Sequence, residues 1–116
     1  MDEMKETVPT HEPSIADIIA RAGCTLPDGR GVHFRKRFPL REWDHLVQLF
    51  NAIEGERVES NVPVLMELVE SWDLSGDPKV EASYRDLDTL DEFLPMVAAL
   101  GEYVRAKLKR AGIEKN

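Results

Sequence analysis

The sequence predicts a mainly α-helical fold, a small bundle of about four to five short helices with one minor β-strand near residues 32–38. Two observations support this class. Apolar residues recur at spacings of three and four through most of the chain, whereas only one short stretch alternates apolar and polar residues. With 116 residues the chain has the size of one domain. We therefore expect a flexible N-terminal arm over residues 1–13, a single helical domain over 14–112, and a disordered tail over 113–116.

The first predicted helix spans residues 15–22. Ser14 is a suitable N-cap, Asp17 stands at the third helical position, and Gly23 is suited to end the helix. Two helical turns are marginal in water by themselves. Since its apolar residues share one face, this helix must dock on the rest of the domain.

Residues 32–38 predict the strand. The apolar Val32, Phe34 and Phe38 fall on one face, and the opposite face carries His33, Arg35 and Arg37. The same run interleaves three cations with two aromatic rings, a pattern that also suits single-stranded nucleic acid. We favour the strand, because the basic run is short and the chain as a whole is acidic.

Two helices are predicted in the middle of the chain. Pro39 begins a helix over residues 40–54 that Gly55 ends, and its apolar stripe consists of Trp43, Leu46, Val47, Phe50 and Ile53. Asn61 and Pro63 begin a second helix that runs to about Ser71. Its apolar side consists of Val64, Leu65, Leu68, Val69 and Trp72.

Trp72 is followed by a polar turn over residues 73–78, and residues 84–90 allow one short turn of helix. Trp72 is thus predicted to mark the point where the core ends and a surface loop begins, at the joint between two helical halves.

The last helix runs toward Arg110 and Gly112. Thr89 and Glu92 read as a capping box at its start. Pro95 then lies past the first turn and bends the helix, but if Asp91 is the cap, Pro95 falls near the end of the first turn and is tolerated better. We expect a kink or a restart there. Beyond it, Met96, Leu100, Val104 and Leu108 recur every four residues.

Charge and composition limit the classes of function. The chain has 22 acidic and 15 basic residues, a formal charge of −7, which repels phosphate backbones and argues against nucleic-acid binding. No signal peptide and no apolar run of membrane-spanning length is visible, so no membrane partner is expected. The single Cys24 fits a reducing compartment. The expected location is the cytoplasm, or the host cytoplasm if the protein is viral.

No catalytic or metal-binding motif is visible. The histidines at positions 11, 33 and 45 have no zinc spacing, and the calcium-like run 73–77 has Pro78 and Tyr84 where a glycine and a glutamate are required. Neither a nucleophile elbow nor a phosphate-binding glycine loop is present. We therefore expect no enzyme, no catalytic residue, no metal and no cofactor. An enzyme with a carboxylate site assembled in three dimensions is the remaining alternative.

Several segments together resemble a known family. Residues 37–43 (Arg-Phe-Pro-Leu-Arg-Glu-Trp) enter a helix, a later helix ends in Trp72-Asp73-Leu74, and Ser75-Gly76-Asp77-Pro78 follows before a leucine-rich closing segment. This order, over roughly residues 32–112, resembles the tail assembly chaperones of long-tailed bacteriophages. The turn is shorter here than is common in that family, and residues 14–22 have no counterpart.

The resemblance implies a non-enzymatic protein that binds the tape measure protein and recruits tail tube subunits during tail assembly, in the short form rather than the frameshifted long form. A small acidic phage adaptor or a head-tail completion protein is the alternative. The residues suggested for partner binding are Trp43, Phe50, Trp72 and Met96. Self-association through the apolar stripes is also predicted.

Overall fold

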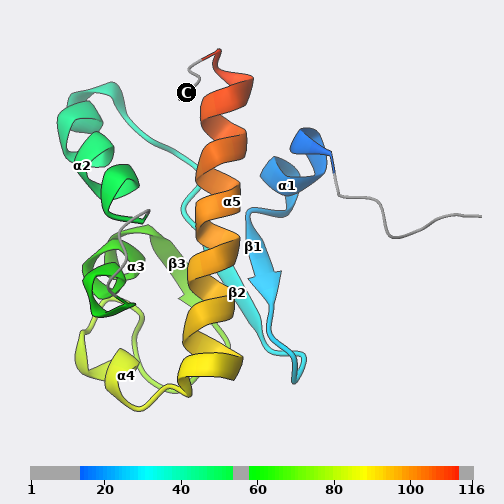
Figure 1. Cartoon of the computed structure of the whole chain (residues 1–116), viewed down its shortest axis with the longest axis vertical. Coiled ribbons are helices and arrows are strands. Elements are labelled where there is room, and N and C mark those ends of the chain that lie inside the picture. The colour runs from blue at the N-terminus through cyan, green and yellow to red at the C-terminus, as the bar shows by residue number, and fades with distance from the viewer. Residues whose placement is uncertain (1–13, 54–57, 113–116) are drawn as a thin grey trace, which may run out of the picture.

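The computed structural model describes residues 14–53 and 58–112, and within them it confirms the mainly helical class with a small sheet (Figure 1). The helices are α1 (Ile15–Arg21), α2 (Trp43–Ile53), α3 (Val62–Leu68), α4 (Ala82–Arg85) and α5 (Leu94–Arg110). The strands are β1 (Gly23–Thr25), β2 (Gly31–Phe34) and β3 (Val69–Trp72). The predicted arm 1–13, the tail 113–116 and the helix end at residues 54–55 lie outside the described residues.

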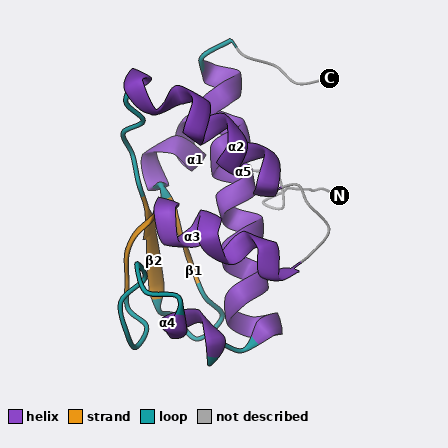
Figure 2. Cartoon of the chain, turned by 90° about the vertical axis from the view of Figure 1, so that its left-hand side faces the viewer, coloured by secondary structure: helices purple, strands orange, loops and turns teal. Residues whose placement is uncertain are grey.

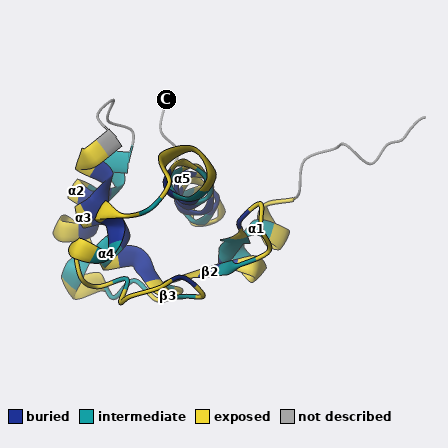
Figure 3. Ribbon diagram, turned by 90° about the horizontal axis from the view of Figure 1, so that it is seen from below, coloured by how far each residue is buried: buried dark blue, intermediate teal, exposed yellow. Residues whose placement is uncertain are grey.

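Helix α5 lies across one face of the sheet and organises the fold (Figures 1 and 3). Helices α2 and α3 flank it on one side, and α1 lies on the other. Figure 2 shows α2 and α3 one above the other beside α5, with the strands at the left of the view. The strands are antiparallel in the order β1-β2-β3.

The core forms between α5, the inner face of β2 and helices α2 and α3. Its largest fully buried side chains are Tyr103, Leu46, Leu65, Leu68, Met96, Leu100, Val32, Val64 and Val69. Full burial of one such aliphatic side chain stabilises the fold by about 1.5–3 kcal/mol. The other residues of the three predicted stripes are buried or half-buried, and Trp43 is the exception at 38% exposure.

The predicted strand is shorter than expected and has two partners that were not predicted. β2 ends at Phe34, and residues 35–38 continue outside the sheet. The predicted division into two faces still holds for the apolar residues: Val32 and Phe34 are buried, His33 is exposed, and Phe38 turns inward against Tyr103. Pairing with β1 and β3 satisfies the backbone groups of β2, which is why one strand alone was an incomplete prediction.

Helix α1 begins at the predicted cap, since the Ser14 Oγ accepts a hydrogen bond from the Asp17 amide at 3.1 Å. Its end differs from the prediction. The left-handed residue is Ala22, with φ 45°, and Gly23 already belongs to β1. Glycine is required at position 23 for another reason: a Cβ there would lie 2.2 Å from the Val32 carbonyl oxygen. Close approach of two strands, and not a positive φ, fixes this glycine.

The helix predicted to run to Ser71 ends at Leu68, so that prediction was wrong over its last turn. Val69 is extended, and residues 69–72 pair with β2 as β3. The Arg35 amide donates to the Leu68 carbonyl at 2.7 Å, which satisfies a carbonyl left free at the helix end. Strand pairing thus overrides helical spacing in a run where both patterns fit.

The start of the last helix also differs in its cap. Asp88, rather than Thr89 or Asp91, accepts from the Asp91 amide at 2.7 Å, while the Glu92 carboxylate accepts from the Asp88 amide at 2.7 Å. Residues 89–93 form a π-helical turn, and α5 follows with Pro95 in its first turn. The helix changes from π to α at Leu94, and Phe93 and Leu94 both keep right-handed helical dihedrals, so the backbone does not break there as a restart would require. The reciprocal cap is present one residue earlier than predicted.

Substitution Gly23→Ala is expected to lower the free energy of unfolding by about 1–3 kcal/mol, because the added methyl group meets backbone that cannot turn away. Urea unfolding followed by circular dichroism measures the change. Gly31→Ala is the matched control, since its nearest neighbour is a side-chain oxygen of Asp73 at 3.3 Å. Equal losses for the two variants would contradict the close approach at Gly23.

Candidate functional site

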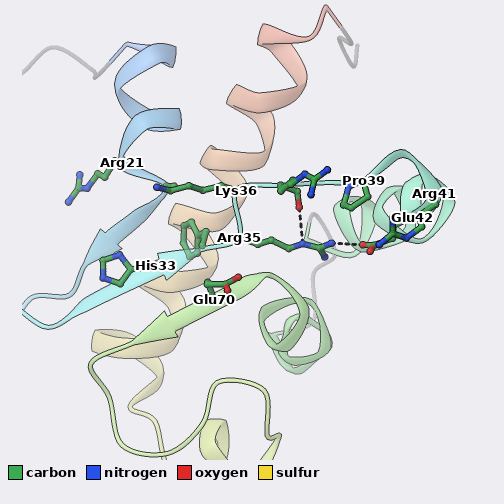
Figure 4. Close-up of a pocket in the computed structure, with 11 residues that line it drawn as sticks. Arg21, His33, Arg35, Lys36, Pro39, Arg41, Glu42 and Glu70 are labelled. Carbon is green, nitrogen blue, oxygen red and sulfur yellow. Dashed lines mark hydrogen bonds and ion pairs between the residues drawn. The ribbon is translucent and has the colours of Figure 1, made fainter.

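A groove lies where β2 ends and the chain turns toward α2 (Figure 4). It encloses about 680 Å³ between the end of α1, the end of β2, the segment 35–42 and β3. Its charged and polar lining consists of Arg21, His33, Arg35, Lys36, Arg37, Arg41, Glu42 and Glu70. Five of the chain's fifteen Lys and Arg residues are here with two carboxylates, a formal charge of +3 in a chain of −7. We call this feature the basic groove.

The backbone beneath the basic groove is fixed by side chains of α5. The Tyr103 hydroxyl donates to the Arg35 carbonyl at 2.9 Å, and the Lys107 ammonium donates to the Lys36 carbonyl at 2.8 Å. Tyr103 and Lys107 are four residues apart, so they lie on the same face of the helix. Both carbonyls are therefore directed toward α5.

Burial changes the acidity of both anchoring side chains. It raises the pKa of the Tyr103 hydroxyl, which keeps the hydroxyl protonated as a donor. It lowers the pKa of the Lys107 ammonium, an effect to which the nearby Arg110 adds. The Lys107 ammonium also lies 5.0 Å from the centre of the Phe38 ring. The ring face and the carbonyl compensate in part for the lost hydration.

The Arg35 side chain is paired with other residues of the groove. Its guanidinium forms an ion pair with Glu42 and donates from Nε to the Arg37 carbonyl at 2.9 Å (Figure 4). The hydrogen bond from Arg35 holds the pKa of the Glu42 carboxyl below its usual value. This pair ties the segment after β2 to the first turn before α2.

Three other cations of the groove are exposed and can form ion pairs with a bound molecule. Lys36, Arg37 and Arg41 are exposed, and their side chains form no hydrogen bond or ion pair with another residue in 14–53 or 58–112. In the view of Figure 4, Lys36 extends toward Arg21, away from the Arg35–Glu42 pair. The groove therefore presents unneutralised positive charge on both sides of a fixed ion pair.

Exposed apolar residues adjoin the basic groove. Leu40 stands between the groove residues Pro39 and Arg41 and is 85% exposed, and Trp43 is 38% exposed. The Trp43 amide donates to the Leu40 carbonyl across one 3₁₀ turn, which places the two side chains on neighbouring positions of one helical surface. We call this pair the apolar rim. A partly exposed Trp beside arginines is typical of protein-binding surfaces, and the exposed Leu40 adds apolar area next to it.

The structure separates the four residues that the sequence suggested for partner binding. Trp43 belongs to the apolar rim. Phe50 is half-buried and packs edge-on against Phe38, with ring centres 6.0 Å apart. Met96 is fully buried in the core and offers no surface in this structure.

Trp72 holds the turn that follows β3. It lies on β3, and its indole Nε1 donates to the Gly76 carbonyl at 2.9 Å. Its ring lies 5.0 Å from that of Tyr84, whose hydroxyl donates to the Pro78 carbonyl at 2.7 Å. Trp72 and Tyr84 therefore fold the turn 73–78 onto the protein. Trp72 was expected to close a helix, and it pairs with Val32 in the sheet instead.

The aromatic rings near the groove face the interior. Phe34 is 2% exposed and packs on Tyr103, with ring centres 5.6 Å apart. Phe38 packs between the side chains of Phe50, Tyr103 and Lys107. The nucleic-acid interpretation of residues 33–38 requires rings that stack on bases. In this structure both rings pack against the core. Residues 33–38 therefore supply positive charge to the groove but no exposed phenylalanine ring on which a base could stack.

The sequence analysis named Arg37 only as part of the basic run and did not suggest Leu40 or Arg41 for partner binding. Two signals were present: a basic run within an acidic chain, and a leucine three residues before Trp43. The spacing rule for helices placed Leu40 at the start of the predicted helix 40–54 and outside its apolar stripe. It could not show that the 3₁₀ turn Leu40–Glu42 would turn its leucine to solvent.

The part of the chain that the structure describes contains no group of three or more His, Cys, Asp or Glu side chains placed to hold a metal ion. Cys24 is half-buried, and burial raises the pKa of its thiol despite the nearby Arg21. Among the described helices, none has the length and apolar character needed to cross a membrane.

No protein family model, curated protein sequence or solved structure matches the chain.

The Arg35–Glu42 pair predicts a pH effect. Because the folded pKa of Glu42 is lowered, its stabilising contribution is present at neutral pH and is lost as the pH falls through that folded pKa. Arg35→Met is expected to raise the Glu42 pKa toward the usual value of about 4.3. Carboxyl carbon NMR titration measures the shift. Glu92 is the internal control, since its pKa is lowered by the Asp88 amide and Arg30. An unchanged Glu42 titration would refute the pairing.

Proposed function

We propose that this protein acts by binding other proteins, as a non-enzymatic tail assembly chaperone that holds a tape measure protein and recruits tail tube subunits. The observation that carries the proposal is the exposure of Leu40 and Trp43 beside the basic groove. Both residues belong to the segment 37–43 with which the resemblance to tail assembly chaperones begins.

The surface has the composition that a protein partner requires. Leu40 leaves most of its apolar area in water, and a partner's apolar side chain that covers it gains about 25 cal/mol for each Å² of apolar area buried. Trp and Arg side chains dominate the energetics of many protein interfaces. The net charge of −7 supports solubility of a chaperone that exposes such residues.

The second part of the resemblance gives weaker support. The Trp72–Pro78 turn is held by the Trp72 indole and the Tyr84 hydroxyl, so it acts as a structural joint between β3 and α4. We assign partner binding to the apolar rim and the basic groove rather than to this turn.

Co-expression with a phage tape measure protein and a tail tube protein is expected to give a soluble complex that co-elutes in size-exclusion chromatography. Leu40→Glu is expected to weaken the complex at least about tenfold, a loss of about 1.4 kcal/mol or more, because it places a charge where apolar area is covered. Isothermal titration calorimetry measures the affinity. Leu40 is 85% exposed, so the substitution leaves the fold intact.

Leu90→Glu is the matched control, since Leu90 is 74% exposed on the π-helical turn before α5. It should bind as the wild type does. Absence of any complex with either tail protein would refute the chaperone function. Presence of the protein in finished virus particles would favour the adaptor or head-tail completion protein. Equal affinity of Leu40→Glu and wild type for the partner would show that the apolar rim is not part of the interface.

A further inference from the structure

We infer that the basic groove binds an acidic segment of a partner protein, with carboxylates on Arg37, Lys36 and Arg41 and an apolar side chain on the rim formed by Leu40 and Trp43. The inference rests on the proposed function only in that the chain acts by binding protein, and it adds the chemistry of the partner. Neither composition nor the resemblance assigns this site.

The charge of the groove favours an acidic occupant. The groove holds five cations and two carboxylates. One of the cations, Arg35, is neutralised by Glu42, whereas Lys36, Arg37 and Arg41 have no ion pair among the described residues. Guanidinium groups bind carboxylates through paired hydrogen bonds of matching geometry. Three exposed cations within six residues therefore fit several carboxylates on one short segment.

The backbone of residues 35–37 is held rigidly by side-chain donors. Tyr103 and Lys107 hold the carbonyls of Arg35 and Lys36, and the Arg35 guanidinium holds the carbonyl of Arg37. The backbone that carries Lys36 and Arg37 is thus fixed before a partner arrives. A fixed backbone reduces the entropy lost on binding, so the charges act as a preformed site.

The groove favours protein over nucleic acid. A single-stranded nucleic acid needs several exposed rings on which successive bases stack. Within the basic run, the rings of Phe34 and Phe38 pack inward against Tyr103, which leaves Trp43 of the apolar rim as an exposed ring beside the groove. The carboxylates of Glu42 and Glu70 also interrupt the positive surface that a continuous phosphate backbone would follow. An acidic peptide places its charges at intervals and tolerates such interruptions.

The apolar rim favours a peptide over a small anion. A free phosphate or a small organic acid would use the cations and leave Leu40 and Trp43 in water. A peptide uses both, since an apolar side chain among its carboxylates covers the rim. The occupant we assign is therefore a peptide segment that is rich in Asp or Glu and carries at least one large apolar residue.

The test uses the full chain and a fluorescein-labelled soluble peptide that presents several glutamates around one leucine. Fluorescence anisotropy at low salt should show saturable binding. A peptide with glutamine at each glutamate position should bind at least about tenfold more weakly. Binding should also weaken steeply when the salt concentration rises above about 0.1 M, where the Debye length falls below about 10 Å.

Variant Arg37→Glu/Arg41→Glu is expected to lose at least about tenfold in affinity for the glutamate peptide. Arg37→Gln/Arg41→Gln, which adds no repulsion, is a second variant in case the first fails to fold. Arg105→Glu is the matched control, because Arg105 is an exposed arginine of α5 that does not line the groove. Circular dichroism confirms that each variant is folded.

The inference is overturned if the glutamate peptide does not bind, or if the glutamine peptide binds equally well. It is also overturned if neither groove variant changes the affinity for the glutamate peptide, or if an oligothymidine strand binds more tightly than that peptide. Light scattering tests a second copy of this chain as the occupant. A dimer that dissociates in the groove variants and excludes the peptide would also overturn the inference. Peptide binding without any tail protein complex would refute the proposed function and leave the inference standing.

Discussion

The backbone around Arg35 is the constraint on which most of this fold and its surface depend. Its amide donates to the Leu68 carbonyl at the end of α3, and its carbonyl accepts from the Tyr103 hydroxyl of α5. The neighbouring Phe34 amide donates to the Ala22 carbonyl at the end of α1. Three helices therefore end at, or lie against, two consecutive residues. A buried carbonyl left without its donor would cost about 1–3 kcal/mol, so these bonds fix the path of the chain after β2.

The same constraint produces the site. When the carbonyls of Arg35 and Lys36 face α5, Phe34 and Phe38 pack into the core beside Tyr103, and Lys36, Arg37 and Arg41 remain at the surface. One short run thus serves two purposes: its aromatic rings complete the core, and its cations form the basic groove. The apolar rim follows directly, because the chain leaves this run through the 3₁₀ turn that exposes Leu40. Packing and the candidate binding surface therefore cannot be changed independently in this region.

The sequence predicted what depends on local periodicity. The apolar spacing of residues 43–53 and 94–110 identified α2 and α5, and the Ser14 cap identified the start of α1. It did not predict what depends on contacts distant in the chain. Val69–Trp72 fits a helix by spacing and becomes a strand because β2 offers it a free edge. Trp43 and Met96 were both suggested for partner binding from the same helical pattern, and Trp43 is partly exposed whereas Met96 lies in the core. Spacing shows which residues share a face, but only tertiary packing decides which face is covered.

The most direct test of this account is a double-mutant cycle on the two donors that hold the segment. Tyr103→Phe keeps the ring but removes the donor to Arg35, and Lys107→Met keeps the apolar stem but removes the donor to Lys36. Urea unfolding gives the free energy of each variant and of the pair. If both donors hold one segment, the first loss releases it, and the double variant should lose less than the sum by at least about 0.5 kcal/mol. Losses that add to within about 0.3 kcal/mol would show two independent bonds and would contradict the account.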